Sequence, residues 1–414
     1  MMFLPLLSAP MSEIRHPELL AIADNCVACG LCVPQCPSYQ VLQNEADSPR
    51  GRIALMRGVL EHKLQPTARL QQHLDQCLTC RQCEKVCPNQ VAYGCLVDGM
   101  RAELLQQQPA RLPWLKRLGL QRLAHQPQWW GRLLKLARLP LVRPLLRHLP
   151  VSQAWLPTLR EMMRRYQPQR WQPCYPPSGE ERGEVMLFLG CLARAVDVAA
   201  INAAIQLLNL FGFRVWVPQQ QVCCGALLKH AGDAVGAAGL LATNRNVFAG
   251  TMPVLTLASG CGADLQDAGD ASFGARVMEV AAFLERHADW RLVECAPLAE
   301  RVTLHDPCTL RNVMRSEQAY HRLLQRIPGL QLLPLAGNQQ CCGAAGTYHL
   351  QHPQIARQLR DDKISAINTT GAEHVCSANF ACGMWLNTAL DGAERQVQHP
   401  LLLLQQQIRK ASSC

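Results

Sequence analysis

Short apolar runs alternate with longer amphipathic stretches between residues 184 and 410. Such short runs are typical of buried strands, and longer stretches with helical periodicity are typical of helices. The predicted strands are Val185–Leu189, Phe213–Val217, Val254–Leu257, Val302–Leu304, Leu330–Leu335 and His374–Ser377. The predicted helices are Val198–Phe211, Ala234–Phe248, Glu317–Arg326 and Gln354–Asn368. Strands that alternate with helices predict an α/β fold with parallel strands.

The N-terminal part of the chain shows helical periodicity instead. Ile53–Lys63 and Ala68–Gln76 are predicted to be amphipathic helices. The Ser48-Pro49 pair before the first of them is a helix-start signal. A mostly helical domain is therefore expected ahead of the α/β region.

The cysteines indicate that the α/β region is an internal duplication. Cys191, the Cys223-Cys224-Gly225 triplet and Cys261 recur as Cys308, Cys341-Cys342-Gly343 and Cys382. The offsets are 117, 118 and 121 residues, a regularity that indicates one ancestral unit copied twice. These cysteines fall at the ends of predicted strands, where the ligand sites of α/β folds collect.

Two other cysteine runs lie in the helical part: Cys26-x-x-Cys29-x-x-Cys32-x-x-x-Cys36-Pro37 and Cys77-x-x-Cys80-x-x-Cys83-x-x-x-Cys87-Pro88. Each is the bacterial ferredoxin pattern, in which three cysteines hold one [4Fe–4S] cluster and the fourth reaches the neighbouring cluster. The first cluster is therefore assigned to Cys26, Cys29, Cys32 and Cys87. The second cluster is assigned to Cys77, Cys80, Cys83 and Cys36. A zinc site is the alternative, which two complete runs disfavour.

The whole chain is thus predicted to be an α+β multidomain protein. The predicted parts are a two-cluster ferredoxin-type domain at 13–108, a connector at 109–183, and two Cys-Cys-Gly repeats at 184–297 and 298–410.

The chemistry of the repeat cysteines stays open at this point. Adjacent thiols in a regular strand point to opposite faces, so bringing both to one site needs a bend. Gly225 and Gly343 permit such a bend. Each repeat then offers four sulfurs, enough for a further iron–sulfur cluster or zinc. A thiol–disulfide redox site and an inert structural site are the other interpretations.

The remaining cysteines lack ligand spacing and are expected to be small buried hydrophobic residues: Cys95, Cys174, Cys295, Cys376 and Cys414. Cys376 is near enough to Cys382 in the sequence to replace it as a ligand. The His305-Asp306 pair is either a proton-handling pair or, as we expect, the end of a strand followed by a turn.

The net charge of +10 is concentrated in the connector. Residues 109–182 hold fourteen Lys or Arg against three acids, with five of the eight tryptophans. Basic amphipathic pieces such as Trp129–Leu139 suit a lipid headgroup region or an acidic partner, whereas the alternative is a solvated linker. Nucleic-acid binding is not expected, because no helix-turn-helix, zinc-finger or RNA-binding signature occurs.

Neither a membrane-spanning segment nor a secretory leader is predicted. The longest charge-free stretches, Val198–Phe213 and Asn246–Ala263, are interrupted by polar residues, proline or glycine and are too short. Met1–Pro10 lacks a basic start, and Met11 is an alternative first residue. The odd number of 21 cysteines fits a reducing cytosolic compartment better than a disulfide framework.

Motifs for a bound dinucleotide, a nucleotide phosphate loop or a hydrolytic site do not occur, and no catalytic residue is predicted. An iron–sulfur cubane passes single electrons and cannot by itself accept a hydride. If an organic substrate is oxidised, a partner subunit must supply a flavin or a similar two-electron cofactor.

Two ferredoxin runs followed by two Cys-Cys-Gly repeats resemble the iron–sulfur subunits of bacterial flavin-linked dehydrogenases, above all that of glycolate oxidase. The resemblance covers residues 13–408 and is weakest in the connector. It includes the stretches Ser48–Ile53, Gln72–Arg81, Ala258–Ala263, Cys341–Tyr348 and Ala356–Lys363. The repeats also resemble those of heterodisulfide reductase, whose pattern ends in Cys-x-x-Cys. Asp264 and Trp385 stand at that last position here, so the ligands of a heterodisulfide-type cluster are not carried over.

The resemblance implies an electron-transfer subunit of a complex whose FAD-binding subunits oxidise glycolate to glyoxylate, or D-lactate to pyruvate. It implies electron flow toward a membrane quinone or its reductase. The complex is expected to be cytoplasmic and peripheral on the inner face of the plasma membrane, held through the basic 109–183 segment. The isolated chain is not expected to act on substrate.

Three alternatives remain at this stage. One is the equivalent subunit of anaerobic glycerol-3-phosphate dehydrogenase or of another 2-hydroxy-acid dehydrogenase. The others are a heterodisulfide-reductase-like thiol redox protein and a zinc-stapled scaffold.

Overall fold

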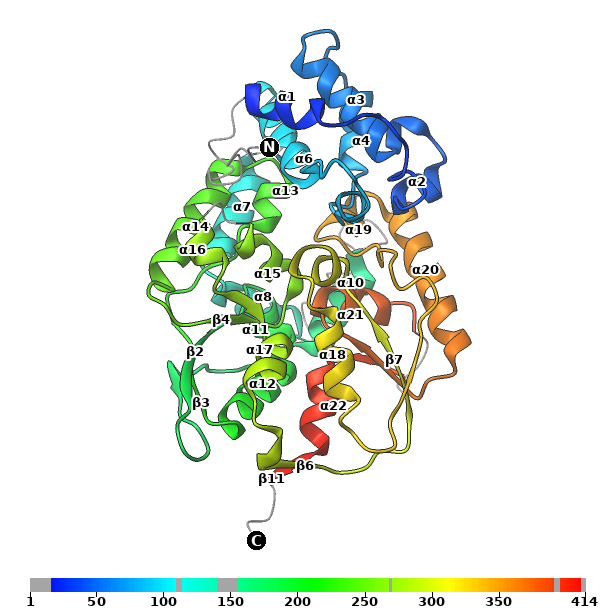
Figure 1. Cartoon of the computed structure of the whole chain (residues 1–414). Helices are drawn as coiled ribbons and strands as arrows, with labels where there is room; N and C mark the ends of the chain where they lie inside the picture. The colour runs from blue at the N-terminus through cyan, green and yellow to red at the C-terminus, as the bar shows by residue number, and fades with distance from the viewer. Residues whose placement is uncertain (1–15, 109–113, 140–154, 268–269, 391–394, 411–414) are drawn as a thin grey trace.

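The computed structural model describes residues 16–108, 114–139, 155–267, 270–390 and 395–410. A helical N-terminal domain covers one end of two sheet-containing units, and the C-terminus lies at the opposite end (Figure 1). The predicted α+β class, with a helical domain followed by duplicated α/β domains, is confirmed. The predicted domain boundaries stay predictions. Met1–Pro10, Met11 and Cys414 lie outside the described residues.

The N-terminal domain consists of short helices joined by the cysteine loops. Its elements are α1 (His16–Asp24), α2 (Pro37–Leu42), η2 (Glu45–Asp47), α3 (Pro49–Leu60), α4 (Ala68–Asp75), α5 (Gln82–Lys85) and α6 (Tyr93–Gln107). The helices α1, α3, α4 and α6 bury an apolar core formed by Leu19, Met56, Leu74, Leu96 and Met100.

Helix α3 begins earlier than the sequence pattern predicted, at Pro49 and not at Ile53. The hydroxyl of Ser48 accepts a hydrogen bond from the backbone N–H of Gly51 at 2.9 Å, which caps the first turn. Pro49 occupies the first helical position, where its missing N–H has no intrahelical partner to lose. The cap, and not the first apolar residue, therefore sets the start of the helix.

The first repeat is built on a five-stranded sheet in the order β1-β3-β2-β4-β5. Its strands are β1 (Cys174–Tyr175), β2 (Gly183–Phe188), β3 (Phe213–Trp216), β4 (Val254–Thr256) and β5 (Val277–Glu279). All neighbours are parallel except β1, which is antiparallel to β3. The helices are α11 (Ala193–Val196), α12 (Val198–Leu210), α13 (Ala226–His230), α14 (Ala234–Val247), α15 (Ser259–Gln266), α16 (Ala271–Gly274) and α17 (Val280–His287).

The second repeat is built on a four-stranded parallel sheet in the order β10-β9-β7-β8. Its strands are β7 (Arg301–His305), β8 (Gln331–Leu333), β9 (His374–Ser377) and β10 (Val397–Gln398). Its helices are η5 (Leu310–Met314), α18 (Glu317–Leu324), α19 (Tyr348–Gln351), α20 (Pro353–Thr370), α21 (Phe380–Asn387) and α22 (Pro400–Gln407). All strands and helices that the hydrophobic pattern predicted in the two repeats are present within a few residues of the expected bounds.

The duplication is visible in strand order and register. The order β3-β2-β4-β5 in the first sheet matches β8-β7-β9-β10 in the second. Phe188 pairs with Thr256 between β2 and β4, and His305 pairs with Ser377 between β7 and β9. Phe188 and His305 therefore occupy equivalent places at the ends of equivalent strands.

The two repeats share one hydrophobic core. It contains Val185 and Leu208 of the first repeat together with Val302, Leu323 and Leu401 of the second. The last helix, α22, packs against α12 of the first repeat. The strand β11 (Ile408–Lys410) then pairs with β6 (Val293–Cys295), which follows the one-turn helix η4 (Trp290–Leu292).

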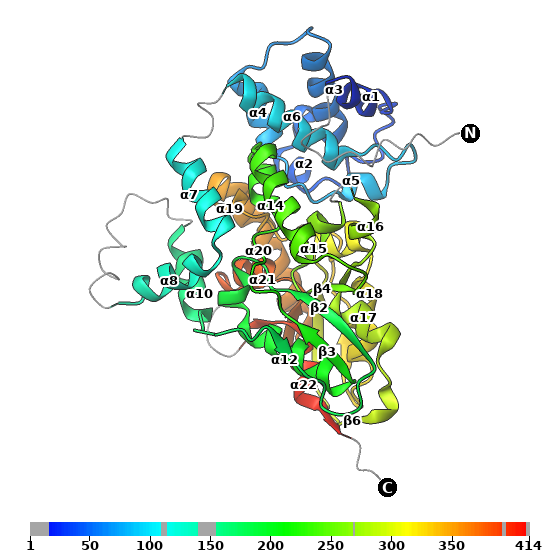
Figure 2. The same cartoon turned by 90° about the vertical axis from the view of Figure 1, so that its left-hand side faces the viewer.

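The connector contributes three described helices, α7 (Trp114–His125), α8 (Gln128–Ala137) and α10 (Trp155–Arg165), which lie along one flank (Figure 2). Helix α10 packs against α8 and α21. Its Arg165 donates hydrogen bonds to Glu161 at 2.8 Å and to the carbonyl of Val397 at 2.7 Å. None of the helices in the described part of the chain is both long and apolar enough to cross a membrane.

Candidate metal centres

The two ferredoxin-type cysteine runs line two adjoining cavities in the N-terminal domain. The first cavity is lined by Cys26, Cys29, Cys32, Cys83 and Cys87. The second cavity is lined by Cys36, Cys77, Cys80 and Cys83. Each cavity thus contains three cysteines of one run and the last cysteine of the other, and Cys83 lines both. The assignment of these cysteines to two clusters stays a prediction. Cys83, Pro49 and Tyr93 line both cavities, so the cavities share a wall.

The backbone of both loops adopts the same unusual conformation around the second cysteine. In the first loop Ala28 and Gly30 have positive φ angles of 54° and 88°. In the second loop Thr79 and Arg81 have φ angles of 50° and 57°. Left-handed residues among right-handed ones turn successive N–H groups toward one side, which makes a concave site for an anion such as an iron–sulfur cluster. Non-glycine residues adopt this conformation at a cost of about 1–2 kcal/mol each.

The donor chemistry fits two [4Fe–4S] clusters. Burial, the largest cause, raises the pKa of Cys32 to about 11. Burial and neighbouring thiols also raise the pKa of Cys80 and of Cys83. Such thiols carry their protons at neutral pH and lose them when they bind metal, so cluster binding by this domain is coupled to proton release.

A buried arginine lies beside the second cavity. Arg52 donates hydrogen bonds to the carbonyl of His73 at 2.6 Å and to the hydroxyl of Ser38 at 3.0 Å. It forms an ion pair with Asp47 at 3.3 Å. Its Nη1 also lies 3.8 Å from the Sγ of Cys36. The sequence placed Arg52 in a stretch shared with a known family, but its burial beside a cysteine depends on how α3 packs.

The two cavities differ in what covers them. The first loop is open to solvent: Cys29 is exposed, and the side chains beside it, Val27 and Leu31, are 66% and 57% exposed. The second loop lies under the second repeat. There, Asn312 donates to the carbonyl of Cys80 at 2.7 Å, and Tyr348 donates to the carbonyl of Gln76 at 3.1 Å.

The first repeat brings its four cysteines together. The Sγ atoms of Cys191 and Cys223 are 3.3 Å apart, and Cys224 contacts both Cys223 and Cys261. Gly225 adopts a φ of 99°, which provides the predicted bend. Cys261 lies in the first turn of α15 and not at the end of β4, a correction to the expected strand end.

A buried ion pair accompanies this first set of thiols. Lys229 pairs with Asp264, the residue that stands where a Cys-x-x-Cys pattern would have its last cysteine. The charge of the Asp264 carboxylate is already neutralised by Lys229. Asp264 is therefore a poor substitute for a thiolate ligand.

The second repeat brings its cysteines together in the same way. Cys341 contacts Cys308 and Cys342, and Cys342 contacts Cys382. Gly343 adopts a φ of 84°, and its missing side chain leaves room for the carbonyl of Ala356, which would lie 2.6 Å from a Cβ atom. Cys382 lies in α21, again in a helix that follows the strand.

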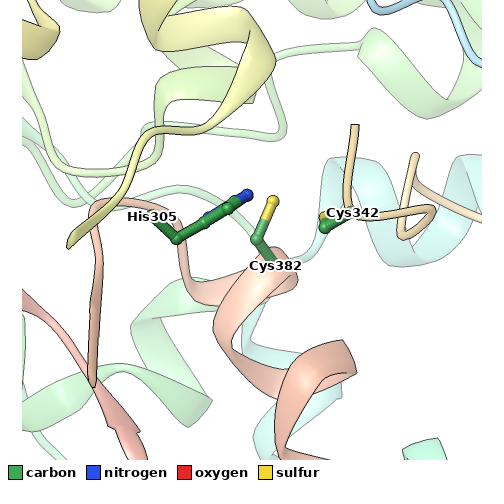
Figure 3. A group of neighbouring side chains, drawn as sticks. All are labelled: His305, Cys342 and Cys382. Carbon is green, nitrogen blue, oxygen red and sulfur yellow. The ribbon is translucent and has the colours of Figure 1, made fainter. Parts of the chain in front are cut away.

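His305 joins the second set of thiols. Its ring lies beside the sulfur of Cys382, with Cys342 next to it (Figure 3). The ligand atoms of these three buried residues all lie within 4.8 Å of one another. Burial, followed by the charges of Lys363 and Arg311, lowers the pKa of His305 well below its usual value, so its ring is neutral.

His305 and Asp306 do not act as a pair. His305 ends β7 as expected, but its Nδ1 hydrogen-bonds to Ser377 at 3.0 Å. Asp306 pairs with His321 at 3.1 Å and accepts from the side chain of Asn338 at 2.8 Å. The sequence did not predict His305 as part of the cysteine site.

The other cysteines were expected to be buried, and among those that the structure describes only Cys376 is. Cys376 is fully buried in β9, and burial raises its pKa to about 12. Cys95, Cys174 and Cys295 are half-buried. Among the described residues, His305, Cys342 and Cys382 lie close enough together to share a metal ion, and Cys376 does not belong to this group.

Comparison with known proteins agrees with these sites. Residues 22–91 match the 4Fe-4S dicluster domain family, and residues 185–266 and 302–387 each match the Cysteine-rich domain family. The "Lactate utilization protein A" of Geobacillus kaustophilus (strain HTA426) is 30% identical over 49% of this chain and 89% of its own length.

Two relatives extend over almost the whole chain. The "Probable glycolate oxidase iron-sulfur subunit" of Bacillus subtilis (strain 168) is 30% identical over 94% of this chain and 95% of its own. The "Glycolate oxidase iron-sulfur subunit" of Escherichia coli (strain K12) is 31% identical over 96% of this chain and 97% of its own. Because both domain types and nearly the full length are shared, the chain belongs to the family of glycolate oxidase iron–sulfur subunits.

Proposed function

We propose that this chain is the electron-transfer subunit of a flavin-linked 2-hydroxy-acid dehydrogenase, with two [4Fe–4S] clusters in its N-terminal domain. The observation that carries the proposal is the lining of two adjoining cavities by the eight cysteines of the two runs, each cavity with three cysteines of one run and the last cysteine of the other, and with Cys83 shared. When bound, each cluster accepts and passes one electron at a time. The role of the chain is to hold the two sites against one shared wall.

The substrate oxidation belongs to partner subunits in this proposal. The partners bind FAD and oxidise glycolate, or D-lactate, to the corresponding 2-oxo acid. Relatives named for glycolate oxidase and for lactate utilization support this substrate class. The equivalent subunit of anaerobic glycerol-3-phosphate dehydrogenase and a thiol redox protein of the heterodisulfide-reductase kind remain the alternatives.

The exposed loop of the first cavity is the proposed docking surface for the flavin subunit. Electron transfer weakens steeply with distance, so a donor must approach one ligand set closely. Cys29 is exposed between Val27 and Leu31, which are two of the most exposed large apolar residues in the described part of the chain. In the second loop Cys80 is half-buried, and Asn312 and Tyr348 of the second repeat hydrogen-bond the loop backbone, so the second repeat occupies surface that a partner would otherwise approach.

The connector is the proposed membrane contact. On α8 and just after it, Leu133, Leu136 and Leu139 are 44%, 52% and 47% exposed. The basic side chains of Arg132, Lys135 and Arg138 lie among them and are exposed as well. Exposed leucines flanked by cations suit the anionic surface of a bilayer.

This surface supports a peripheral position on the inner, cytoplasmic face of the plasma membrane, next to a quinone or its reductase. Because α10 packs against both α8 and α21, it links this contact to the helix that carries Cys382 of the second repeat.

Anaerobic purification of the complex with its flavin subunits tests the proposal. We expect about eight iron and eight sulfide per chain for two clusters, and reduction of an artificial dye with glycolate or D-lactate. Glycerol-3-phosphate as the only active substrate would favour the first alternative. Turnover of a disulfide by the isolated chain would favour the second, and zinc without iron would refute the two-cluster proposal.

A further inference from the structure

The second repeat contains a nitrogen donor that the first repeat lacks. His305, Cys342 and Cys382 are all buried, and one ligand atom from each lies within 4.8 Å of the others (Figure 3). Ligands held about 2.0–2.3 Å from one ion lie about 3.5–4 Å apart in a tetrahedral site. A small side-chain adjustment therefore suffices to bring the three donors around a metal.

The orientation of the imidazole supports metal binding. The Nδ1 of His305 is held by the hydroxyl of Ser377 at 3.0 Å, and this bond directs the rest of the ring toward the two sulfurs. Histidines that bind metals are commonly oriented by a hydrogen bond at the second ring nitrogen. The pairing of β7 with β9 sets His305 opposite Ser377, so the sheet itself fixes the ring.

Two further sulfurs complete the donor set. Cys308 and Cys341 contact each other, and Cys341 contacts Cys342, so four thiols and one imidazole lie next to one another. Thiolate and imidazole together are the preferred ligands of Zn²⁺ and of the iron of iron–sulfur centres. A site of this composition is suited to a thiophilic metal and poorly suited to Mg²⁺ or Ca²⁺, which prefer oxygen ligands.

The charges around the second site differ from those around the first. Lys363 on α20 is buried close to Cys342 and Cys341 and donates a hydrogen bond to the carbonyl of Gly337. Ala237 and Ala356 pack against the glycines of the two Cys-Cys-Gly triplets at equivalent places. Asn244 and Lys363 each follow that alanine by seven residues, so Asn244 is the counterpart of Lys363. A buried cation near thiolates offsets their negative charge, whereas Asn244 is neutral and hydrogen-bonds the backbone of Val222 and Cys223.

From these contacts we propose that the second repeat holds a metal centre in which His305 is a ligand together with Cys342 and Cys382, with Cys308 and Cys341 as the adjacent sulfurs. The first repeat has Phe188 in place of His305 and Thr256 in place of Ser377, so its four thiols do not form the same mixed site. The two repeats are therefore chemically different despite their common origin. The proposal does not depend on the substrate or on the two N-terminal clusters.

A metal-content comparison of the full chain tests this ligation. His305→Phe introduces the residue that the first repeat carries at the equivalent place. We expect the wild-type chain, purified anaerobically, to hold metal beyond the roughly eight irons of two clusters. The variant should lose this excess and keep the roughly eight irons. Cys376→Ala, a change at a buried cysteine of the same repeat, should keep both.

Spectroscopy of the unaltered chain provides a measurement that does not depend on the folding of a variant. If the centre contains iron, pulsed electron paramagnetic resonance should detect hyperfine coupling to an imidazole nitrogen. If it contains zinc, X-ray absorption should show one nitrogen among sulfur ligands. Metal analysis separates these two cases. A wild-type chain with no metal beyond two clusters, or a centre with sulfur ligands alone, would overturn the proposal, as would retention of the full metal content by His305→Phe.

Discussion

The Nη1 of Arg52 lies 3.8 Å from the Sγ of Cys36, and the arginine side chain is only 1% exposed. The same guanidinium binds the carbonyl of His73, the hydroxyl of Ser38 and the carboxylate of Asp47. A positive charge is thus fixed beside the cysteine that the crossed assignment gives to the second cluster. Net charge and hydrogen bonds to sulfur are among the factors that set the reduction potential of such a cluster.

Arg52→Met should make the reduction potential of the second cluster more negative, because the reduced cluster carries more negative charge and loses a stabilising cation. It should also lower stability, by less than the cost of about 3–5 kcal/mol for a fully broken buried pair, since Asp47 keeps its contact with His73. Potentiometric titration and thermal unfolding measure the two effects. Arg57→Met is the matched control: Arg57 lies on the same helix, is 46% exposed, and pairs with Asp24 and Glu61 at the surface. Its replacement should change stability by less than about 1 kcal/mol, and an equal shift of potential in both variants would refute the role of Arg52.

The crossed assignment predicts which cysteine variants resemble one another. Cys36→Ser should damage the same cluster as Cys80→Ser, although Cys36 belongs to the first run. Cys87→Ser should damage the same cluster as Cys29→Ser. The measurement is electron paramagnetic resonance of each dithionite-reduced variant, in which the surviving cluster gives the spectrum. If Cys36→Ser instead matched Cys29→Ser, the fourth ligands would not be exchanged between the runs.

A negative charge beside Cys29 should weaken binding of the flavin subunit. Val27→Glu together with Leu31→Glu places two charges on an exposed apolar surface, and burying them in an interface is unfavourable. We expect at least a tenfold weaker association, with a tenfold difference corresponding to about 1.4 kcal/mol, and slower cluster reduction by glycolate. Reduction by dithionite should be unchanged.

Val235→Glu is the control for this surface, because Val235 is 69% exposed on α14 of the first repeat. If the wild-type complex is reduced by glycolate and the Val27/Leu31 variant is reduced equally fast, the docking surface is wrongly assigned while the function stands. If the wild-type complex is not reduced by any 2-hydroxy acid, the proposed function itself is wrong.

Removal of positive charge from α8 should release the complex from membranes. Arg132→Gln, Lys135→Gln and Arg138→Gln together remove three charges, each worth about 1 kcal/mol near an anionic surface. Co-sedimentation with vesicles that contain an anionic phospholipid should fall in the variant, and wild-type binding should weaken as salt rises. Leu133→Glu should act in the same direction, whereas Leu292→Glu, at a residue 45% exposed in the first repeat, should have no effect. Unchanged sedimentation of the triple variant at low salt would argue for a merely solvated connector.

The buried carboxyl of Glu279 should make stability fall as pH rises. Burial raises its pKa to about 8, against the effect of a hydrogen bond from Tyr320 at 2.5 Å. An unfolded glutamate loses its proton near pH 4.3, so between about pH 4.5 and 8 the folded state binds the proton and the unfolded state does not. In this window Glu279 lowers the free energy of unfolding by at most about 1.4 kcal/mol for each pH unit of increase. Glu279→Gln should flatten the decline measured by thermal unfolding at several pH values, and an identical pH profile in both proteins would exclude this carboxyl as its source.

Much of the local structure could be predicted from the order of residues. The strand Val254–Leu257 and the helix Val198–Phe211 were expected nearly where β4 and α12 lie, because strong apolar runs and long periodic stretches carry a clear signal. Apolar periodicity placed the start of α3 at Ile53, a few residues too late, although the Ser48-Pro49 signal marked the observed start at Pro49. Cys261 and Cys382 were expected at strand ends and lie in helices that follow, because only two residues separate each strand from the next helix.

The sequence alone determined that this protein has cysteines in two ferredoxin-type runs and in two repeated sets, because cysteine spacing is a property of the chain and not of its packing. Only the tertiary structure decided how these sets lie relative to one another, which loop is exposed, and which set of thiols has a histidine beside it. Those answers depend on contacts between residues far apart in the chain, such as Asn312 with Cys80 and His305 with Ser377. No local pattern encodes such contacts, since they arise when strands pair and helices pack around a shared core.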